Sequence, residues 1–268
     1  MIDPETYLAR IGLTDRPAGA QGLRDMQAAH MAHVVFENVG PFLGGVPSLT
    51  PEAVYEKVVG RNRGGYCFEL NGIFQLILNE VGFRPTSVLA RVRNGADEGG
   101  ARTHQALIVP QDGKDWLVDV GFGGPGAVWP LDLGDPSPQT VANGTYRLRT
   151  EDLSGETVLE VARGQNWFAL YGFDRVPVRQ VDIEAANHLA ATWRKAPFST
   201  HLMLARHGAD GHVTLFNRRL RVGEAIRLLA NSAELADVIR NRFSMPLPDE
   251  TIDVLWARIR DLPVERPA

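Results

Sequence analysis

Cys67, His104 and Asp119 carry the groups that a nucleophilic acyl transfer requires. Cys67 is the only cysteine in the chain, and it directly follows a loop that contains Gly64 and Gly65. We expect it to open a helix, where unpaired N–H groups and the helix dipole favour the nucleophilic thiolate. His104 would accept the thiol proton, while Asp119 would bind the other ring nitrogen and fix the orientation of the imidazole.

The elements that position these three residues follow from the spacing of apolar residues. A 3.6-residue period after Cys67 predicts a helix that ends before Gly82. Alternation predicts strands over 88–93, 103–109 and 116–120, with His104 on the second and Asp119 on the third. Since the connecting loops are short, the strands form an antiparallel meander, in which a partly buried Asp119 pairs with a histidine of the neighbouring strand.

Glu37 is a second carboxylate with apolar neighbours, in the segment Phe36-Glu37-Asn38-Val39 that we expect to end the second helix. A buried carboxylate requires a cationic partner. Arg63 is the candidate, and such an ion pair would brace the loop that leads to Cys67.

A glycine-rich loop, 121–126, follows Asp119 directly. Such a loop lets the backbone approach another molecule, for example a cofactor phosphate held by N–H groups. A wide turn between strands is the alternative interpretation. The loop is not a P-loop, because no Gly-Lys-Ser/Thr follows it.

The composition excludes several functional classes. The chain has 268 residues, 44% hydrophobic and 22% charged, and a net charge of −4, which argues against nucleic acid as the main partner. No apolar run is long enough to cross a membrane, and the polar, acidic N-terminus is unlike a signal peptide. A lone cysteine forms no internal disulfide and fits a reducing cytoplasm. No metal-binding motif is present, and the oligomeric state stays open.

The order of nucleophile on a helix start, then histidine and aspartate on adjacent strands, resembles papain-like and transglutaminase-like proteins. More specifically, the chain resembles the arylamine N-acetyltransferase family. The resemblance covers most of the length and depends on five elements, which are Phe36-Glu37-Asn38, Arg63-Gly64-Gly65-Tyr66-Cys67-Phe68-Glu69, Thr103-His104, Trp116-Leu117-Val118-Asp119-Val120-Gly121-Phe122-Gly123 and Pro197-Phe198-Ser199-Thr200-His201-Leu202.

The resemblance implies an α+β fold with a cysteine-protease-like triad of Cys67, His104 and Asp119. Its parts are a helical bundle (1–83) that carries the nucleophile, an antiparallel β-barrel (84–182) that carries His and Asp, and an α/β lid (183–268). The implied acyl donor is acetyl-coenzyme A, without a metal, and the acceptor is an arylamine, hydrazine or N-hydroxyarylamine. The implied contact residues are Thr103, Gly123, Gly124, Gly126 and Phe198 for coenzyme A, and Phe36 and Phe68 for the acceptor.

The implied reaction is ping-pong, through an acetyl thioester on Cys67. Three other functions remain open at this point. One is an amide synthase that closes a macrocycle from a carrier-bound acyl chain with the same triad. Another is a cysteine peptidase or amidase whose acceptor is water. The third is a binding protein that has kept the fold without turnover.

Overall fold

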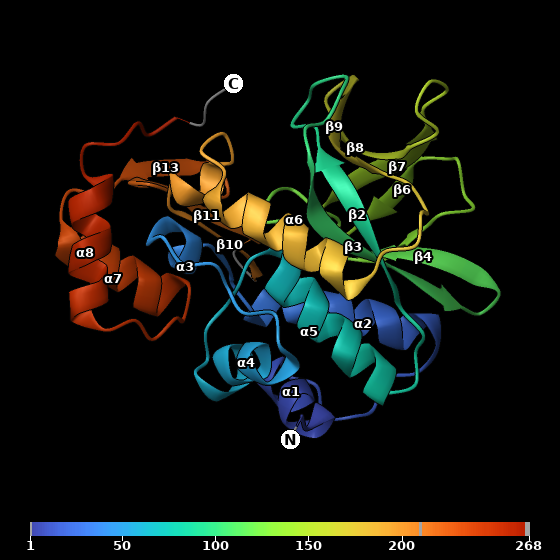
Figure 1. Cartoon of the computed structure of the whole chain (residues 1–268), viewed down its shortest axis with the longest axis horizontal. Coiled ribbons are helices and arrows are strands. Elements are labelled where there is room, and N and C mark those ends of the chain that lie inside the picture. The colour runs from blue at the N-terminus through green and yellow to red at the C-terminus, as the bar shows by residue number, and fades with distance from the viewer. Residues whose placement is uncertain (1, 209–210, 266–268) are drawn as a thin grey trace.

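A computed structural model of the chain describes residues 2–208 and 211–265. Helices form the N-terminal part, strands the middle, and a smaller sheet with helices around it the C-terminal part (Figure 1). The N-terminal helices are α1 (Pro4–Arg10), α2 (Gly19–His33), α3 (Val39–Phe42), α4 (Pro51–Tyr55), η1 (Glu56–Gly60) and α5 (Cys67–Glu80).

Helix α5 is the element that presents Cys67. The backbone N–H of Tyr66 donates to Glu69 Oε2 at 3.2 Å, which satisfies one of the donors at the helix start. The apolar residues at helical spacing are buried, as the sequence pattern predicts. The helix ends at Glu80, and Gly82 then adopts a φ of +104°, a conformation that favours glycine.

The middle of the chain forms an antiparallel sheet of eight strands in the order β5-β4-β3-β2-β9-β8-β7-β6, which curves into a barrel-like shape (Figure 1). Its strands are β2 (Thr86–Val92), β3 (Arg102–Gln111), β4 (Lys114–Val118), β5 (Leu131–Asp132), β6 (Gln139–Val141), β7 (Gly144–Thr150), β8 (Thr157–Arg163) and β9 (Asn166–Phe173). The predicted meander is confirmed, because β3 pairs antiparallel with both β2 and β4. The predicted third strand, 116–120, ends two residues too late: β4 ends at Val118, so Asp119 lies in the following loop.

The C-terminal sheet has the order β1-β10-β11-β12-β13. Its elements and the helices around it are β1 (Phe36–Glu37), α6 (Gln180–Thr192), η2 (Pro197–Ser199), β10 (Met203–Gly208), β11 (Gly211–Phe216), β12 (Arg219–Val222), β13 (Ala225–Leu228), α7 (Ser232–Asp237), η3 (Val238–Arg242) and α8 (Asp249–Ile259). Helix α2 ends at His33, before the segment that was predicted to terminate it, but we did not predict that Phe36 pairs with Ala205 and Glu37 with Leu204 as strand β1. A strand this short has a distant partner and leaves no local alternation to detect.

Among the residues that the structure describes, the buried apolar side chains form three clusters beneath these layers. The largest joins α1, α2 and α5 to strands β2 to β4 and to α6, another lies between the C-terminal sheet and helices α7 and α8, and the third fills the barrel-like sheet. In Figure 1, helix α6 runs across the molecule between the barrel-like sheet and the C-terminal elements. No helix in the described part of the chain is both long and apolar enough to span a membrane.

Candidate active site

The structure brings Cys67, His104 and Asp119 together from α5, β3 and the loop after β4. His104 Nε2 lies 2.7 Å from Asp119 Oδ2, and Cys67 lies close enough to His104 to contribute to raising the pKa of its imidazole. The Cys67 sulfur also lies 3.7 Å from the carbonyl oxygen of Thr103. The three side chains are nearly buried, with 2%, 3% and 7% of their residues' surfaces exposed. A thiol, an imidazole and a carboxylate are therefore neighbours in one buried site, which is the arrangement that a nucleophilic triad requires.

The charges at this site favour a protonated imidazole. Burial alone would lower the pKa of His104, but the charge and hydrogen bond of Asp119, together with Cys67, raise the pKa of His104 to about 10. Burial would likewise raise the pKa of Asp119, but the charge of His104 outweighs burial and lowers that pKa. An imidazolium at neutral pH can hold a thiolate as an ion pair.

This pair gives the stability of the fold a defined pH dependence. The pKa of His104 rises from 6.5 to about 10 on folding, so between these values the folded chain binds more protons than the unfolded chain. The stabilisation is fully present below pH 6.5 and is lost as the pH rises through about 10. We expect the free energy of unfolding of the wild type, measured with urea, to fall relative to His104→Gln across that window. A constant difference between the two proteins would contradict a raised pKa.

Asn71 fastens helix α5 to the strands that carry the histidine and the aspartate. Its side-chain Nδ2 donates to Gln105 O at 2.6 Å and to Asp119 Oδ1 at 2.9 Å, and its Oδ1 accepts from Val120 N at 3.0 Å. Asn71 is fully buried, and every one of these bonds satisfies a group that burial removes from water. We did not predict this role, although an asparagine one turn after Cys67 on an otherwise apolar face was a usable signal.

Gly121 is required by the close approach of the loop after Asp119 to the start of α5. A Cβ at this position would lie 2.7 Å from Cys67 Cα and 2.8 Å from Asn71 Nδ2. Any side chain there would push the loop away from the helix and separate Asp119 from its donors.

The prediction that Arg63 pairs with a buried Glu37 is confirmed. Arg63 Nη2 lies 2.6 Å from Glu37 Oε1, and the Glu37 side chain is fully buried. Lys57, which we did not predict here, lies 3.3 Å from Glu37 and 2.7 Å from Glu69 Oε1. Burial would raise the pKa of Glu37, but Lys57 and Arg63 outweigh burial and lower that pKa. The network ties β1 to the loop that leads into α5.

We expect Arg63→Ala to lower the free energy of unfolding by about 2 kcal/mol, because a buried carboxylate loses a charged hydrogen-bond donor. Urea denaturation measures the change. Arg61→Ala is the matched control, since the Arg61–Glu56 pair is 72% and 58% exposed and its loss should cost less than about 0.5 kcal/mol. Equal losses in the two variants would contradict a structural role for the Glu37 network.

A cleft of about 480 Å³ opens beside Cys67 and His104. Of the residues predicted to contact coenzyme A, Thr103, Gly123, Gly124 and Phe198 line this cleft. Gly126 lies outside it, where its carbonyl oxygen accepts from Asn143 Nδ2 at 2.8 Å.

The two phenylalanines predicted to contact the acceptor occupy different places. Phe36 lines the cleft, with its ring centroid 6.1 Å from that of Phe198. Phe68 is 1% exposed, lies outside the cleft and packs edge-on against Tyr66 at 5.5 Å. Phe122, which we did not predict as a contact residue, lines the cleft with its ring 5.3 Å from that of His104.

Within residues 2–208 and 211–265, no group of three or more histidine, cysteine, aspartate or glutamate residues could hold a metal ion.

The sequence and the structure were compared with known proteins. A family model for N-acetyltransferases matches residues 20–252. The arylamine N-acetyltransferase of Escherichia coli strain K12 is 34% identical over 253 residues, which cover 91% of this chain and 89% of that protein. The arylamine N-acetyltransferase of Mycolicibacterium smegmatis is 36% identical over 273 residues, covering 97% and 98% of the two chains. The solved structure of Mycobacterium marinum arylamine N-acetyltransferase in complex with CoA has a TM-score of 0.88 and 32% identity, and covers 96% of this chain and 99% of that chain. The chain therefore belongs to the arylamine N-acetyltransferase family of acyltransferases.

Proposed function

We propose that the chain transfers an acetyl group from acetyl-coenzyme A to an arylamine, hydrazine or N-hydroxyarylamine through a thioester on Cys67. The observation that carries this proposal is the position of His104, which contacts both Cys67 and Asp119 at the inner end of a cleft. A thiolate held by an imidazolium is a nucleophile suited to a thioester donor.

In the first half-reaction the Cys67 thiolate attacks the acetyl carbonyl carbon. The backbone N–H of Cys67, at the first turn of α5, is placed to stabilise the negative charge that forms on the carbonyl oxygen. His104, protonated by the pair with Asp119, donates its proton to the leaving thiolate of coenzyme A. The products are free coenzyme A and acetylated Cys67.

In the second half-reaction the amine attacks the thioester and His104 accepts the amine proton. The acetyl group passes to nitrogen, the C–S bond breaks, and the Cys67 thiolate forms again opposite the imidazolium. Phe36, Phe122 and Phe198 give the cleft aromatic walls, which suit a flat aromatic amine. Phe68 is left out of this wall because it is buried in the core.

The donor is proposed to follow the cleft past Thr103 and the loop with Gly123 and Gly124, where backbone approach is close. Gly126 would act indirectly, since its bond with Asn143 holds the end of that loop.

Initial rates test the reaction order. With acetyl-coenzyme A varied at several fixed concentrations of an arylamine, a ping-pong reaction gives parallel double-reciprocal lines, and coenzyme A forms in equal amount to acetylated amine. Converging lines would contradict the thioester. Release of coenzyme A at the same rate without amine would indicate a hydrolase instead, and turnover only with a carrier-bound acyl chain would indicate an amide synthase.

A further inference from the structure

The outer part of the cleft is positively charged, although the chain as a whole carries a net charge of −4. Arg163, Arg194 and Lys195 are among the residues that line it, and of the described lining residues none is aspartate or glutamate. We infer that these three cations form a subsite that binds the phosphate groups at the nucleotide end of the acyl donor. This inference rests on the proposed donor and extends it to residues of the cleft mouth.

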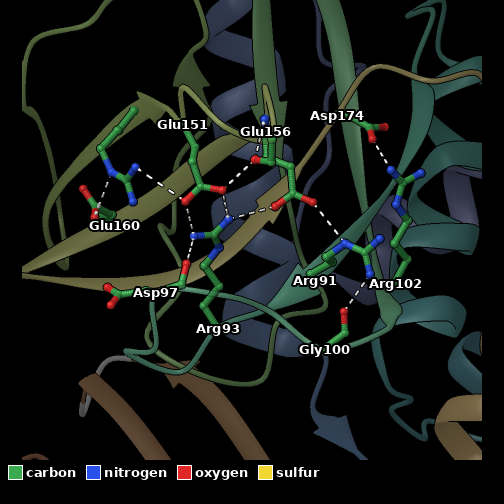
Figure 2. Close-up of polar contacts among 11 residues, drawn as sticks. Arg91, Arg93, Asp97, Gly100, Arg102, Glu151, Glu156, Glu160 and Asp174 are labelled. Atoms are coloured by element: carbon green, nitrogen blue, oxygen red, sulfur yellow. Dashed lines mark hydrogen bonds and ion pairs between the residues drawn. The ribbon is translucent and has the colours of Figure 1, made fainter.

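Other arginines near the cleft are neutralised by acids and cannot serve in this way (Figure 2). Arg93 is 4% exposed and binds Glu151 at 2.8 Å and Glu156 at 2.9 Å. Arg91 lies 3.1 Å from the other oxygen of Glu156 and donates to Gly100 O at 2.7 Å. Through the bond from Arg91 to Gly100, which lines the cleft, this network holds the loop after β2. The two glutamates balance the charges of the two arginines, so the network adds no net positive charge to the cleft.

Arg163 is the last residue of β8, and its guanidinium lies over an aromatic ring. Its guanidinium lies 3.4 Å from the centroid of the Phe168 ring, which also lines the cleft, so the charge is held over an aromatic face. Burial lowers the pKa of Arg163, and the like charge of Arg221 lowers it further. Two neighbouring guanidinium groups repel each other, and an anion between or beside them relieves that repulsion.

Arg194 and Lys195 lie in the connection between α6 and η2. They are exposed, and the same connection leads to Phe198 on η2. Trp193 precedes them, is 39% exposed and also lines the cleft, with Lys195 Nζ 5.9 Å from its ring centroid. An exposed indole beside cations is a surface on which a nucleotide base can stack while the cations bind its phosphates.

The cleft therefore has two chemically distinct ends. Cys67 and His104 form a nearly dry inner end that suits the small acyl group, and Arg163, Arg194 and Lys195 form a wet cationic mouth. A donor with a phosphorylated nucleotide at one end and a thioester at the other matches this order. The subsite would select such a donor over neutral thioesters or esters and raise its rate of encounter.

The test is a triple variant, Arg163→Gln with Arg194→Gln and Lys195→Gln, compared with the wild type and with Arg84→Gln. Arg84 is exposed and lies outside the cleft, so its variant controls for the loss of a single exposed cation away from the cleft. We expect kcat/KM for acetyl-coenzyme A to fall about tenfold in the triple variant, because several exposed ion pairs are lost, and to stay unchanged in Arg84→Gln. Added salt should reduce the wild-type value more than that of the triple variant.

Two further substrates separate phosphate binding from general damage. Acetyl-dephospho-coenzyme A lacks the 3′-phosphate. The wild type should therefore have a lower kcat/KM for it than for acetyl-coenzyme A, and this difference should be smaller in the triple variant. Acetylation of Cys67 by p-nitrophenyl acetate, which has no phosphate, should proceed at the same rate in the wild type and both variants. If the triple variant does not fold, each single variant should lose about two- to threefold in kcat/KM.

The possible failures can be told apart. Equal kcat/KM for acetyl-coenzyme A in the wild type and the triple variant would overturn the subsite and leave the proposed function intact. If the triple variant lost as much rate with p-nitrophenyl acetate as with acetyl-coenzyme A, the substitutions would have perturbed the inner end of the cleft. That result would also overturn the subsite. If acetyl-coenzyme A fails to acetylate even wild-type Cys67 while p-nitrophenyl acetate succeeds, the proposed donor is wrong, and the subsite inference fails with it.

Discussion

Replacing Cys67 with alanine is expected to abolish acetyl transfer, with a loss of at least about 10⁴-fold in kcat. The thiol is the only group of its kind in the chain, and no other described side chain of the cleft combines contact with His104 and a place at the start of a helix. Without the sulfur there is no covalent intermediate, and direct attack of the amine on bound acetyl-coenzyme A lacks the activation that the ion pair supplies. Steady-state rates with an arylamine and acetyl-coenzyme A measure the effect.

The control for Cys67→Ala is an unchanged fold. Cys67 is buried but small, so alanine removes one sulfur atom and should cost only about 1 kcal/mol of stability. The variant should still bind coenzyme A, and its unfolding transition should remain cooperative. A folded variant that turns over at a rate near the wild type would refute Cys67 as the nucleophile.

Replacing His104 with glutamine has the second largest expected effect, a loss of about 10³- to 10⁴-fold in kcat/KM. Glutamine can still donate a hydrogen bond to Asp119, but it neither accepts the thiol proton nor carries a positive charge beside the sulfur. Cys67 should therefore react only slowly with iodoacetamide near neutral pH. The alkylation rate, followed by intact-protein mass, measures this change separately from substrate binding.

His201→Gln provides the matched control for His104→Gln. His201 is another histidine that lines the cleft, but its ring stacks on Phe216 at 5.0 Å, and burial lowers rather than raises its pKa. Its replacement should leave the alkylation rate of Cys67 unchanged. If His104→Gln also left that rate unchanged, His104 would not be the partner of the thiol.

The fold around the nucleophile follows from local sequence patterns. The 3.6-residue period after Cys67 and the alternation around His104 are strong signals, because each segment buries one face against the same core. The pairing of Glu37 with Arg63 is also predictable, since a carboxylate among apolar residues requires a cation. The division of the chain into three parts, with boundaries after residues 83 and 182, stays a prediction. One buried cluster crosses both boundaries, since it runs from the N-terminal helices through β2 to β4 and on to α6.

Other features of the site depend on contacts between distant segments and left no local signal. Strand β1 exists only because β10 pairs with it, and Lys57 joins the Glu37 network from a different helical segment. Family resemblance placed Phe68 at the acceptor, but the structure places it in the core and Phe122 at the cleft. Which aromatic side chains line a cleft and which are buried is set by tertiary packing, which spacing alone does not encode.

The mass of the intact wild-type protein after mixing with acetyl-coenzyme A alone tests the thioester most directly. We expect the addition of a single acetyl group, located on Cys67 by peptide mapping, and its complete removal when an arylamine is added, with acetylated amine formed in equal amount. A protein that turns over arylamines rapidly yet never gains that mass, under conditions where the donor is bound, would contradict an acetylated Cys67 as the intermediate.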